Sequence, residues 1–284
     1  MTTSNRIPAP PSSPRTTPGA PPAAPSTPPL SPWASMPTVQ AGRRVLVYGQ
    51  GGLGKSRLCC AAPGPVLVFD FDESLSTLWS QLPEEQRANV LTYIPKDWQD
   101  FMDKMSNQQL FDKIQTIVID TATVAERASE AWVLANVRAS SGKATSIEDY
   151  GYGKGYRFIF EQWIKLLSVA DIHRRAGRNV VFVAHAANAK TANPSGEDFL
   201  RVEPALQGTD KFSIRNRLYE WTDYCIYMQM DQAVSKDGKV SGQNSRTIYT
   251  CGQPWFMAKQ RGNAPEIIYP DVNDLEDVWT KLFA

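Results

Sequence analysis

The segment GQGGLGKS at residues 49–56 constrains the fold of this chain more than any other feature. It follows the apolar run RVLVYG (44–49) and fits the pattern G-x-x-x-x-G-K-[ST] through Gly49, Gly54, Lys55 and Ser56. Glycines let the backbone turn tightly, so that its N–H groups point inward at phosphate oxygens. The alternative is an ordinary glycine-rich turn. The buried strand before it and the short helix that can follow favour a phosphate-binding loop.

The loop pattern also predicts what its side chains do. Lys55 is expected to reach the β- and γ-phosphates of ATP, and Ser56 to offer its hydroxyl to Mg²⁺. The helix that begins there adds the positive end of its dipole. We expect the nucleotide to contact the whole loop, namely Gly49, Gln50, Gly51, Gly52, Leu53, Gly54, Lys55, Ser56 and Arg57.

The remaining pattern is that of an α/β protein. Continuous apolar runs, typical of buried parallel strands, occupy 65–72, 89–94, 116–122 and 179–185. Apolar positions at helical spacing predict a helix over 157–176, and 97–113 also suits a helix. Later runs at 223–230, 246–251 and 255–261 suggest further strands, some of them antiparallel. We therefore predict a mostly parallel, twisted sheet flanked by helices.

Residues 1–38 differ in composition from the rest of the chain. They hold 12 of the 21 prolines and no acidic residue. Such a segment buries too little apolar surface to offset the entropy of ordering, so we predict a disordered tail and one ATPase domain over 39–284. A solvated tail is the simplest interpretation, and a docking segment for a single-strand-binding protein is the alternative.

Net charge, apolar runs and cysteine spacing narrow the class of protein further. The formal net charge is +1, which does not suggest a protein that coats polyanions or membrane surfaces. No apolar run approaches the ~20 residues of a membrane-spanning helix, and the N-terminus has no apolar signal core. The four cysteines form no C-x-x-C pair, so reduced thiols in a cytoplasmic protein are expected.

Acidic residues end two of the predicted strands. Asp120 ends the run TIVID, where a Walker B aspartate would hold the water shell of Mg²⁺. The alternative for Asp120 is capping of the following helix. Asp70, Asp72 and Glu73 follow the run VLVF, and we expect Asp72 or Glu73 to activate the attacking water. Helix capping or simple solvation is again the alternative.

The order of these parts resembles the RecA/KaiC-type P-loop ATPases over about residues 40–265. It is most similar to their compact phage nucleotide-binding proteins, some of which are single-strand annealing recombinases on a RecA-like core. The resemblance rests on GQGGLGKS, VFDFDE, TIVIDT, VVFVAH and AKQR, in that order. It implies that Asp72, with Glu73 next, is the catalytic carboxylate, and that His185 senses the γ-phosphate. RecA itself has Gln at the sensor position, and a hydrogen bond at the sheet end is the alternative role for His185.

The same resemblance gives a role to Lys259 and Arg261. They look like the K-x-R pair that reaches across a subunit interface to the neighbouring γ-phosphate. Such cations neutralise charge in the transition state and require a ring or filament with ATP at its interfaces. The alternative is two solvated bases on a loop.

Two polar segments are candidates for contact with single-stranded DNA, because RecA-like cores bind it through two loops. The first, 139–156, interleaves tyrosines with glycines and basic side chains, which can stack on bases and meet phosphates. The second, 187–217, has basic side chains among Gly, Pro and Asn residues. The candidate contacts are Lys143, Tyr150, Tyr152, Lys154, Tyr156, Lys190, Arg201 and Lys211. Alternatively, the tyrosines pack on a neighbouring subunit or close a turn.

The leading hypothesis is therefore a phage-type RecA-like ATPase that oligomerises, binds single-stranded DNA and promotes annealing or recombination. A second hypothesis is a nucleotide-gated DNA-binding module with little hydrolysis. A third is a P-loop kinase or motor without a DNA substrate. DNA-stimulated hydrolysis would favour the first.

Overall fold

The computed structural model describes residues 41–284 except 141, 194–195, 209–210 and 235–239. The predicted tail, residues 1–38, lies outside the described residues. Within them, one sheet contains ten strands in two groups. The parallel group comprises β1 (Arg44–Gly49), β2 (Val66–Asp70), β3 (Val90–Tyr93), β4 (Thr116–Asp120), β7 (Asn179–Thr191) and β9 (Tyr224–Val234). The antiparallel group comprises β8 (Phe199–Pro204), β10 (Val240–Tyr249), β11 (Lys259–Gln260) and β12 (Ile267–Ile268).

The sheet has the order β12-β10-β9-β1-β7-β4-β2-β3, with β8 attached to β7 and β11 to β9. The strand that leads into the phosphate-loop motif, β1, is central. It pairs in parallel with β7 on one side and with β9 on the other. The predicted α/β class with a mostly parallel sheet and late antiparallel strands is confirmed.

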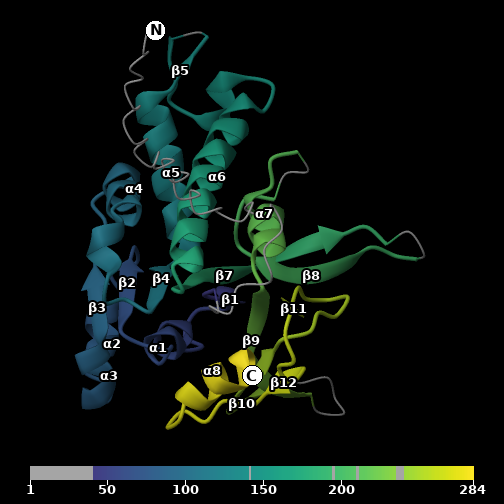
Figure 1. Cartoon of the computed structure of the whole chain (residues 1–284). Coiled ribbons are helices and arrows are strands. Elements are labelled where there is room, and N and C mark those ends of the chain that lie inside the picture. Colours follow the sequence, from purple (N-terminus) through teal and green to yellow (C-terminus); the bar gives the residue numbers. More distant parts are fainter. Residues whose placement is uncertain (1–40, 141, 194–195, 209–210, 235–239) are drawn as a thin grey trace, which may run out of the picture. The chain divides into compact units, whose positions relative to one another are not determined.

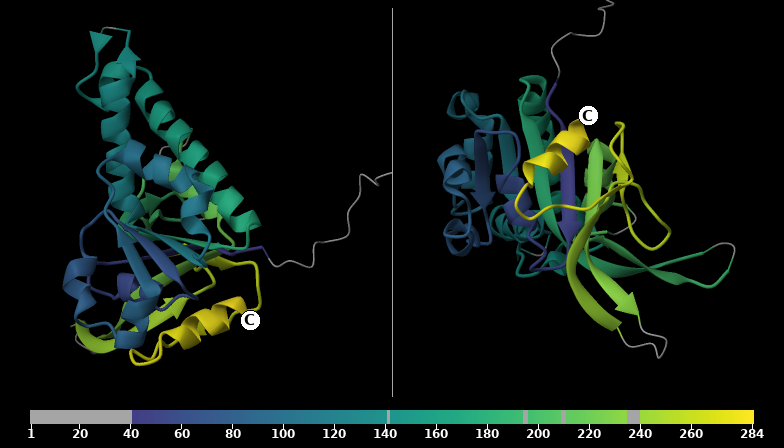
Figure 2. Two further views of the ribbon diagram at one scale, coloured as in Figure 1. Left: turned by 60° about the vertical axis from the view of Figure 1, so that its left-hand side comes forward. Right: turned by 90° about the horizontal axis from the view of Figure 1, so that it is seen from below.

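Helices cover both faces of the sheet, as Figures 1 and 2 show. Side chains of β1 alternate between them, because Leu46 and Tyr48 enter one core and Val45 and Val47 the other. The first core is covered by α4 (Trp98–Ser106), α5 (Ala122–Asn136), α6 (Lys154–Arg175) and α7 (Ile214–Trp221). The second is covered by α1 (Lys55–Cys60), α2 (Leu75–Trp79) and α8 (Glu276–Phe283), with α3 (Glu84–Asn89) joining α2 to β3. Burial on both faces explains why the strands are continuous apolar runs.

Several element bounds differ from the sequence prediction. The helix expected over 97–113 ends at Ser106, and a short 3-10 turn, η1 (Gln108–Phe111), follows because the Asn107 side chain accepts the N–H of Gln109. The strand expected to end at 185 continues to Thr191. The run 255–261 contributes only the two residues of β11.

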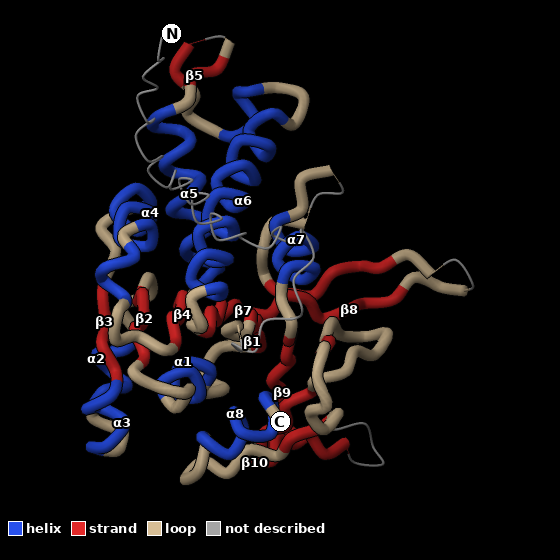
Figure 3. The backbone as a smooth tube through the Cα atoms, viewed as in Figure 1, coloured by secondary structure: helices blue, strands red, loops and turns tan. Residues whose placement is uncertain are grey.

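Helices α5 and α6 form a long hairpin that projects from the sheet, as the tube in Figure 3 shows. Its tip carries the small strands β5 (Arg138–Ala139) and β6 (Gly142–Lys143) and the 3-10 turn η2 (Ile147–Tyr150). The 15 residues of α5 span about 22 Å at 1.5 Å per residue. The candidate DNA segment 139–156 therefore lies far along this hairpin and not at the end of β4.

Among the described residues, no helix is both long and apolar enough to cross a membrane.

Candidate nucleotide site

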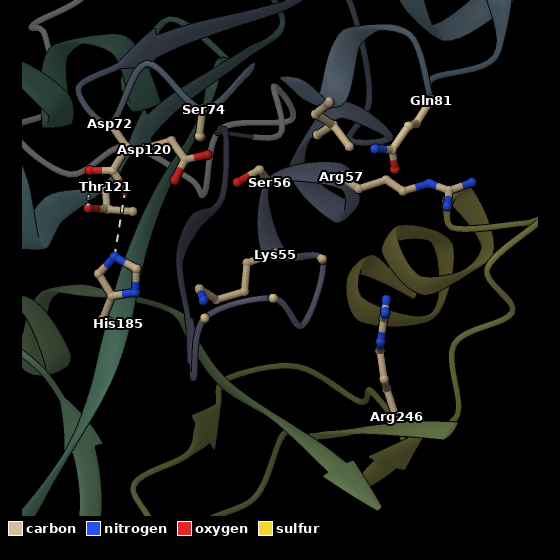
Figure 4. Close-up of a pocket in the computed structure, with 14 residues that line it drawn as sticks. Lys55, Ser56, Arg57, Asp72, Ser74, Gln81, Asp120, Thr121, His185 and Arg246 are labelled. Atoms are coloured by element: carbon tan, nitrogen blue, oxygen red, sulfur yellow. Dashed lines mark hydrogen bonds and ion pairs between the residues drawn. The ribbon is translucent and has the colours of Figure 1, made fainter. Parts of the chain in front are cut away.

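A cavity of about 360 Å³ opens at the carboxyl ends of β1, β2 and β4, beside His185 in the middle of β7 (Figure 4). Parallel strands place their following loops at one edge of a sheet, which is where ligands bind in such folds. The cavity is lined by Gly51, Gly52, Gly54, Lys55, Ser56, Arg57, Asp72, Ser74, Leu78, Gln81, Asp120, Thr121, His185 and Arg246. The sequence motifs from four separate segments thus meet in one place.

The glycines of the loop meet specific steric requirements. Gly52 and Gly54 have φ values of 75° and 83°, a region that side chains with a Cβ rarely adopt. A Cβ on Gly49, the last residue of β1, would lie 2.5 Å from the Met228 carbonyl oxygen of the neighbouring β9. Gly49, Gln50 and Leu53 do not line the cavity, and Leu53 is buried in the second core. Of the predicted nucleotide contacts, those that line the cavity are Gly51, Gly52, Gly54, Lys55, Ser56 and Arg57.

Lys55 lies buried at the centre of the cavity floor, and its Nζ donates to the Gln50 carbonyl oxygen at 2.7 Å. Burial lowers the pKa of the ammonium group, and the nearby Asp120 carboxylate acts in the opposite direction. An amine held by one loop carbonyl has donors left for an incoming phosphate.

Asp120 and Ser56 fit the requirements of a Mg²⁺ site. Asp120 is 1% exposed, and neither of its carboxylate oxygens has a hydrogen-bond partner among the described residues. Burial raises its pKa to about 6. The Ser56 hydroxyl is close enough to lower that pKa but does not reach hydrogen-bond geometry. Two buried, unpaired oxygens beside a hydroxyl are hard ligands of the kind that Mg²⁺ takes, directly or through its waters.

Three acids follow β2, and the structure gives each a different environment. The Asp70 carboxylate accepts the backbone N–H groups of Ser74 and Leu75, so it caps α2. Asp72 lines the cavity. Glu73 is exposed, has a φ of 53° and lines a different hollow on the other side of α2. The strand ends at Asp70, so the turn that follows decides the directions of the Asp72 and Glu73 side chains.

His185 is the last residue in the parallel pairing of β7 with β1, and it faces Asp72 at one end of the cavity. Its Nε2 lies 3.6 Å from Oδ2 of Asp72, and the Thr121 hydroxyl lies 3.4 Å from Oδ1 of the same carboxylate. The His185 side chain is 40% exposed, so it is open to a ligand. The peptide of His185 is fixed by the Thr123 hydroxyl, which accepts its N–H, and by the N–H of Ala205, which binds its carbonyl oxygen.

Sequence analysis missed several residues of the cavity, of which Arg246 is the most informative. It lies on β10, almost 200 residues after the loop, and it borders the cavity beside Gly54. The strand pattern RTIYTC gave no sign that its first residue faces a ligand. Three further lining residues also lacked a sequence signal: Ser74 just before α2, Leu78 in α2 and Gln81 in the turn after it.

Lys259 and Arg261 lie away from the cavity of their own chain. In the antiparallel pairing of β11 with β9, Lys259 lies opposite Cys225, near the start of β9 and at the sheet edge opposite the phosphate loop. Its Nζ donates to the Glu220 carbonyl oxygen at 3.2 Å. Arg261 contacts Asp223 at 3.3 Å. The predicted role in a neighbouring site stays a prediction.

The first candidate DNA segment is partly built into the protein core. Tyr150 is 5% exposed, and its hydroxyl donates to the carbonyl oxygens of Val133 and Val137. It closes the turn and does not present its ring for base stacking, so that assignment was wrong. Tyr152 is fully exposed, whereas the Tyr156 hydroxyl donates to Glu148. Lys143 and Lys154 are exposed at the tip of the hairpin.

The second candidate segment contains the β7–β8 hairpin. Lys190 is exposed on it and pairs with Asp198 at 3.0 Å, and Lys211 is exposed beyond it. Arg201 instead contacts the buried carboxylate of Glu203, which also binds Arg215 at 2.6 Å. An uncompensated buried charge is costly, so these two arginines stabilise Glu203.

The comparison with known families agrees with this geometry. Residues 41–262 match the family model described as AAA domain. No curated protein is significantly similar to the chain. The match covers most of the chain and spans every residue of the cavity, so this protein belongs to the AAA domain family and its body is a nucleotide-binding P-loop NTPase.

Proposed function

We propose that the protein hydrolyses ATP with Mg²⁺ at this site, and that it is a phage-type RecA-like recombination protein that binds single-stranded DNA as an oligomer and promotes annealing. One observation carries most of the argument. Asp72 and His185 meet at the cavity end where Asp120 also lies, and the chain continues from His185 directly into the β7–β8 hairpin.

The residues divide the chemistry among them. Lys55 binds the terminal phosphates, while Ser56 and Asp120 hold the Mg²⁺ water shell. The bound metal supplies charge neutralisation at the phosphates. Asp72 orients the attacking water and accepts its proton, because it lines the cavity near Asp120 with a side chain that is 22% exposed.

His185 links this chemistry to the hairpin. When a γ-phosphate is bound, the His185 imidazole can contact either the phosphate or the Asp72 carboxylate. Its peptide is bonded to both α5 and the end of β8, so a shift of His185 moves the hairpin base. Hydrolysis would then alter the position of the hairpin, as in switches that respond to loss of a γ-phosphate.

The hairpin and its neighbour have a surface suited to single-stranded DNA. Lys190, Leu200 and Trp255 are exposed, with Trp255 57% accessible. Trp255 lies beside β8, because its carbonyl oxygen accepts the N–H of Val202 at 2.7 Å. Aromatic faces stack on bases without sequence preference, and lysines meet phosphates. We favour the second candidate segment for DNA contact, because the chain continues from His185 directly into the β7–β8 hairpin.

The experiment is the ATP hydrolysis rate with and without single-stranded DNA at low and moderate salt, with Lys55→Ala as the inactive control. We expect clear stimulation by DNA that weakens as salt rises, because phosphate contacts are salt-dependent. Hydrolysis indifferent to DNA would indicate a kinase or motor. ATP-dependent DNA binding without hydrolysis would indicate a nucleotide-gated module.

The link through His185 has its own test. In His185→Ala, DNA affinity should no longer differ between ADP and a non-hydrolysable ATP analogue, while nucleotide binding persists. An unchanged difference would exclude His185 as the link.

A further inference from the structure

The nucleotide cavity has two chemically different ends, which Figure 4 shows on either side of Lys55 and Ser56. One end contains Asp72, Asp120, Thr121 and His185. The other contains Arg57, Gln81 and Arg246. Acids and an imidazole thus gather at one end, and cations with an amide at the other.

This difference fixes the direction of a bound nucleotide. The metal-side carboxylate Asp120 and the water-orienting Asp72 must lie near the γ-phosphate. The triphosphate runs from there across Lys55 and Ser56, so the nucleoside has to lie at the opposite end. That end is the one bordered by Arg246 and Gln81. The step rests on the proposed role of Asp72 in hydrolysis.

Arg246 is available to bind a ligand there. None of the described residues forms a hydrogen bond or ion pair with its guanidinium group, although the side chain is only partly exposed. A Cβ on Gly54 would lie 2.8 Å from its Nη1, so the guanidinium group lies directly over the loop. Arg57, in contrast, donates through Nη2 to the Val272 carbonyl oxygen, although its Nε has no partner among the described residues.

The surroundings of Arg246 suit a flat, partly apolar group. Leu78 provides an apolar wall in the same cavity, and the Gln81 amide offers both a donor and an acceptor. A guanidinium plane stacks well on an aromatic ring, in a way that an ammonium group does not reproduce. These are the contacts that a purine base requires, and a phosphate would use none of the apolar ones.

We propose that Arg246 binds the nucleoside end of the nucleotide by stacking its guanidinium plane on the base, with Gln81 beside the base edge. Arg246 is then a determinant of nucleotide affinity and not a γ-phosphate sensor. It also places a base contact on the β9–β10 hairpin, far in sequence from the phosphate loop.

The test measures the binding of ADP, of a non-hydrolysable ATP analogue and of inorganic tripolyphosphate to Arg246→Ala by titration calorimetry. We expect affinity for both nucleotides to fall by the same factor, about tenfold, within the range of cation–π contacts. Tripolyphosphate, which has no nucleoside, should bind as it does to the unaltered protein. Its retained binding also shows that the variant is folded and that the phosphate loop is intact.

The other outcomes would overturn the proposal. Loss confined to the ATP analogue would make Arg246 a γ-phosphate residue, and equal loss for tripolyphosphate would make it a general phosphate contact. Unchanged binding of all three ligands would remove it from the site. Arg246→Lys should restore less than half of the lost affinity, and full recovery would exclude stacking. Arg175→Ala, an exposed arginine near the end of α6, is the matched control.

The unaltered protein tests the proposed direction of the nucleotide on its own. If it binds tripolyphosphate as tightly as the ATP analogue, the nucleoside makes no contact and that direction is wrong, whatever Arg246→Ala shows. The two failures are therefore distinguishable.

Discussion

The imidazole Nε2 of His185 lies 3.6 Å from the carboxylate Oδ2 of Asp72, so the residue that leads into the β7–β8 hairpin contacts the acid that follows β2. These residues are 113 positions apart, and parallel pairing through β4 brings their strands to one sheet edge. The pair connects the proposed water-orienting group with the proposed γ-phosphate sensor.

Asp72→Asn should reduce the hydrolysis rate at least about 100-fold while ATP binding persists, because the amide cannot accept the proton of the attacking water. Glu73→Gln is the matched control and should retain near-normal rates, since Glu73 lines a different hollow. The measurement is the steady-state hydrolysis rate of each variant, with its ATP affinity determined in parallel. The reverse pattern would assign the catalytic carboxylate to Glu73.

Glu126→Gln should change how stability depends on pH. Burial raises the pKa of Glu126 to about 7, while the backbone N–H of Gln207, 3.0 Å from each carboxylate oxygen, lowers it. A raised carboxyl pKa contributes stability below the unfolded value near 4.5, and this is lost as pH rises through about 7.

The unaltered protein should therefore lose on the order of 1–3 kcal/mol from this group between about pH 5 and 8, and the Gln variant should not. Urea unfolding of both proteins across that range gives the difference. Parallel curves for the two proteins would show that Glu126 does not titrate in this range.

Tyr150→Phe should destabilise the protein by about 1–2 kcal/mol, because the carbonyl oxygens of Val133 and Val137 lose their shared hydroxyl donor. Tyr152→Ala should leave stability within about 0.5 kcal/mol, since that side chain is fully exposed. Thermal unfolding checks both. Equal effects would mean that the hairpin tip packs differently in solution.

Arg261→Ala should abolish ATP-dependent assembly and lower hydrolysis if Arg261 completes a neighbouring site. The monomer should stay folded, because Arg44 still binds Asp223 at 2.8 Å. Light scattering with ATP measures assembly, with Arg175→Ala as the control. A variant that assembles and hydrolyses normally would limit Arg261 to its contact with Asp223.

The sequence by itself determined the fold class and the centre of the site. Strands buried on both faces must be continuous apolar runs. The glycines at residues 49–56 permit the tight backbone turn that a phosphate-binding loop requires. The position of Asp120 follows equally directly, because it ends such a strand. These features depend on residues close together in the chain, where spacing alone fixes geometry.

Only the tertiary structure decided which side chains share the cavity. A turn after β2 directs Asp72 inward and Glu73 away, and no local pattern specifies such a turn. Tyr150 and Tyr152 are two positions apart, yet one is buried against α5 and the other fully exposed. Arg246 reaches the phosphate loop because β10 pairs with β9, which itself lies beside β1. Such contacts arise from strand order across the whole sheet, and that order is a property of long-range packing.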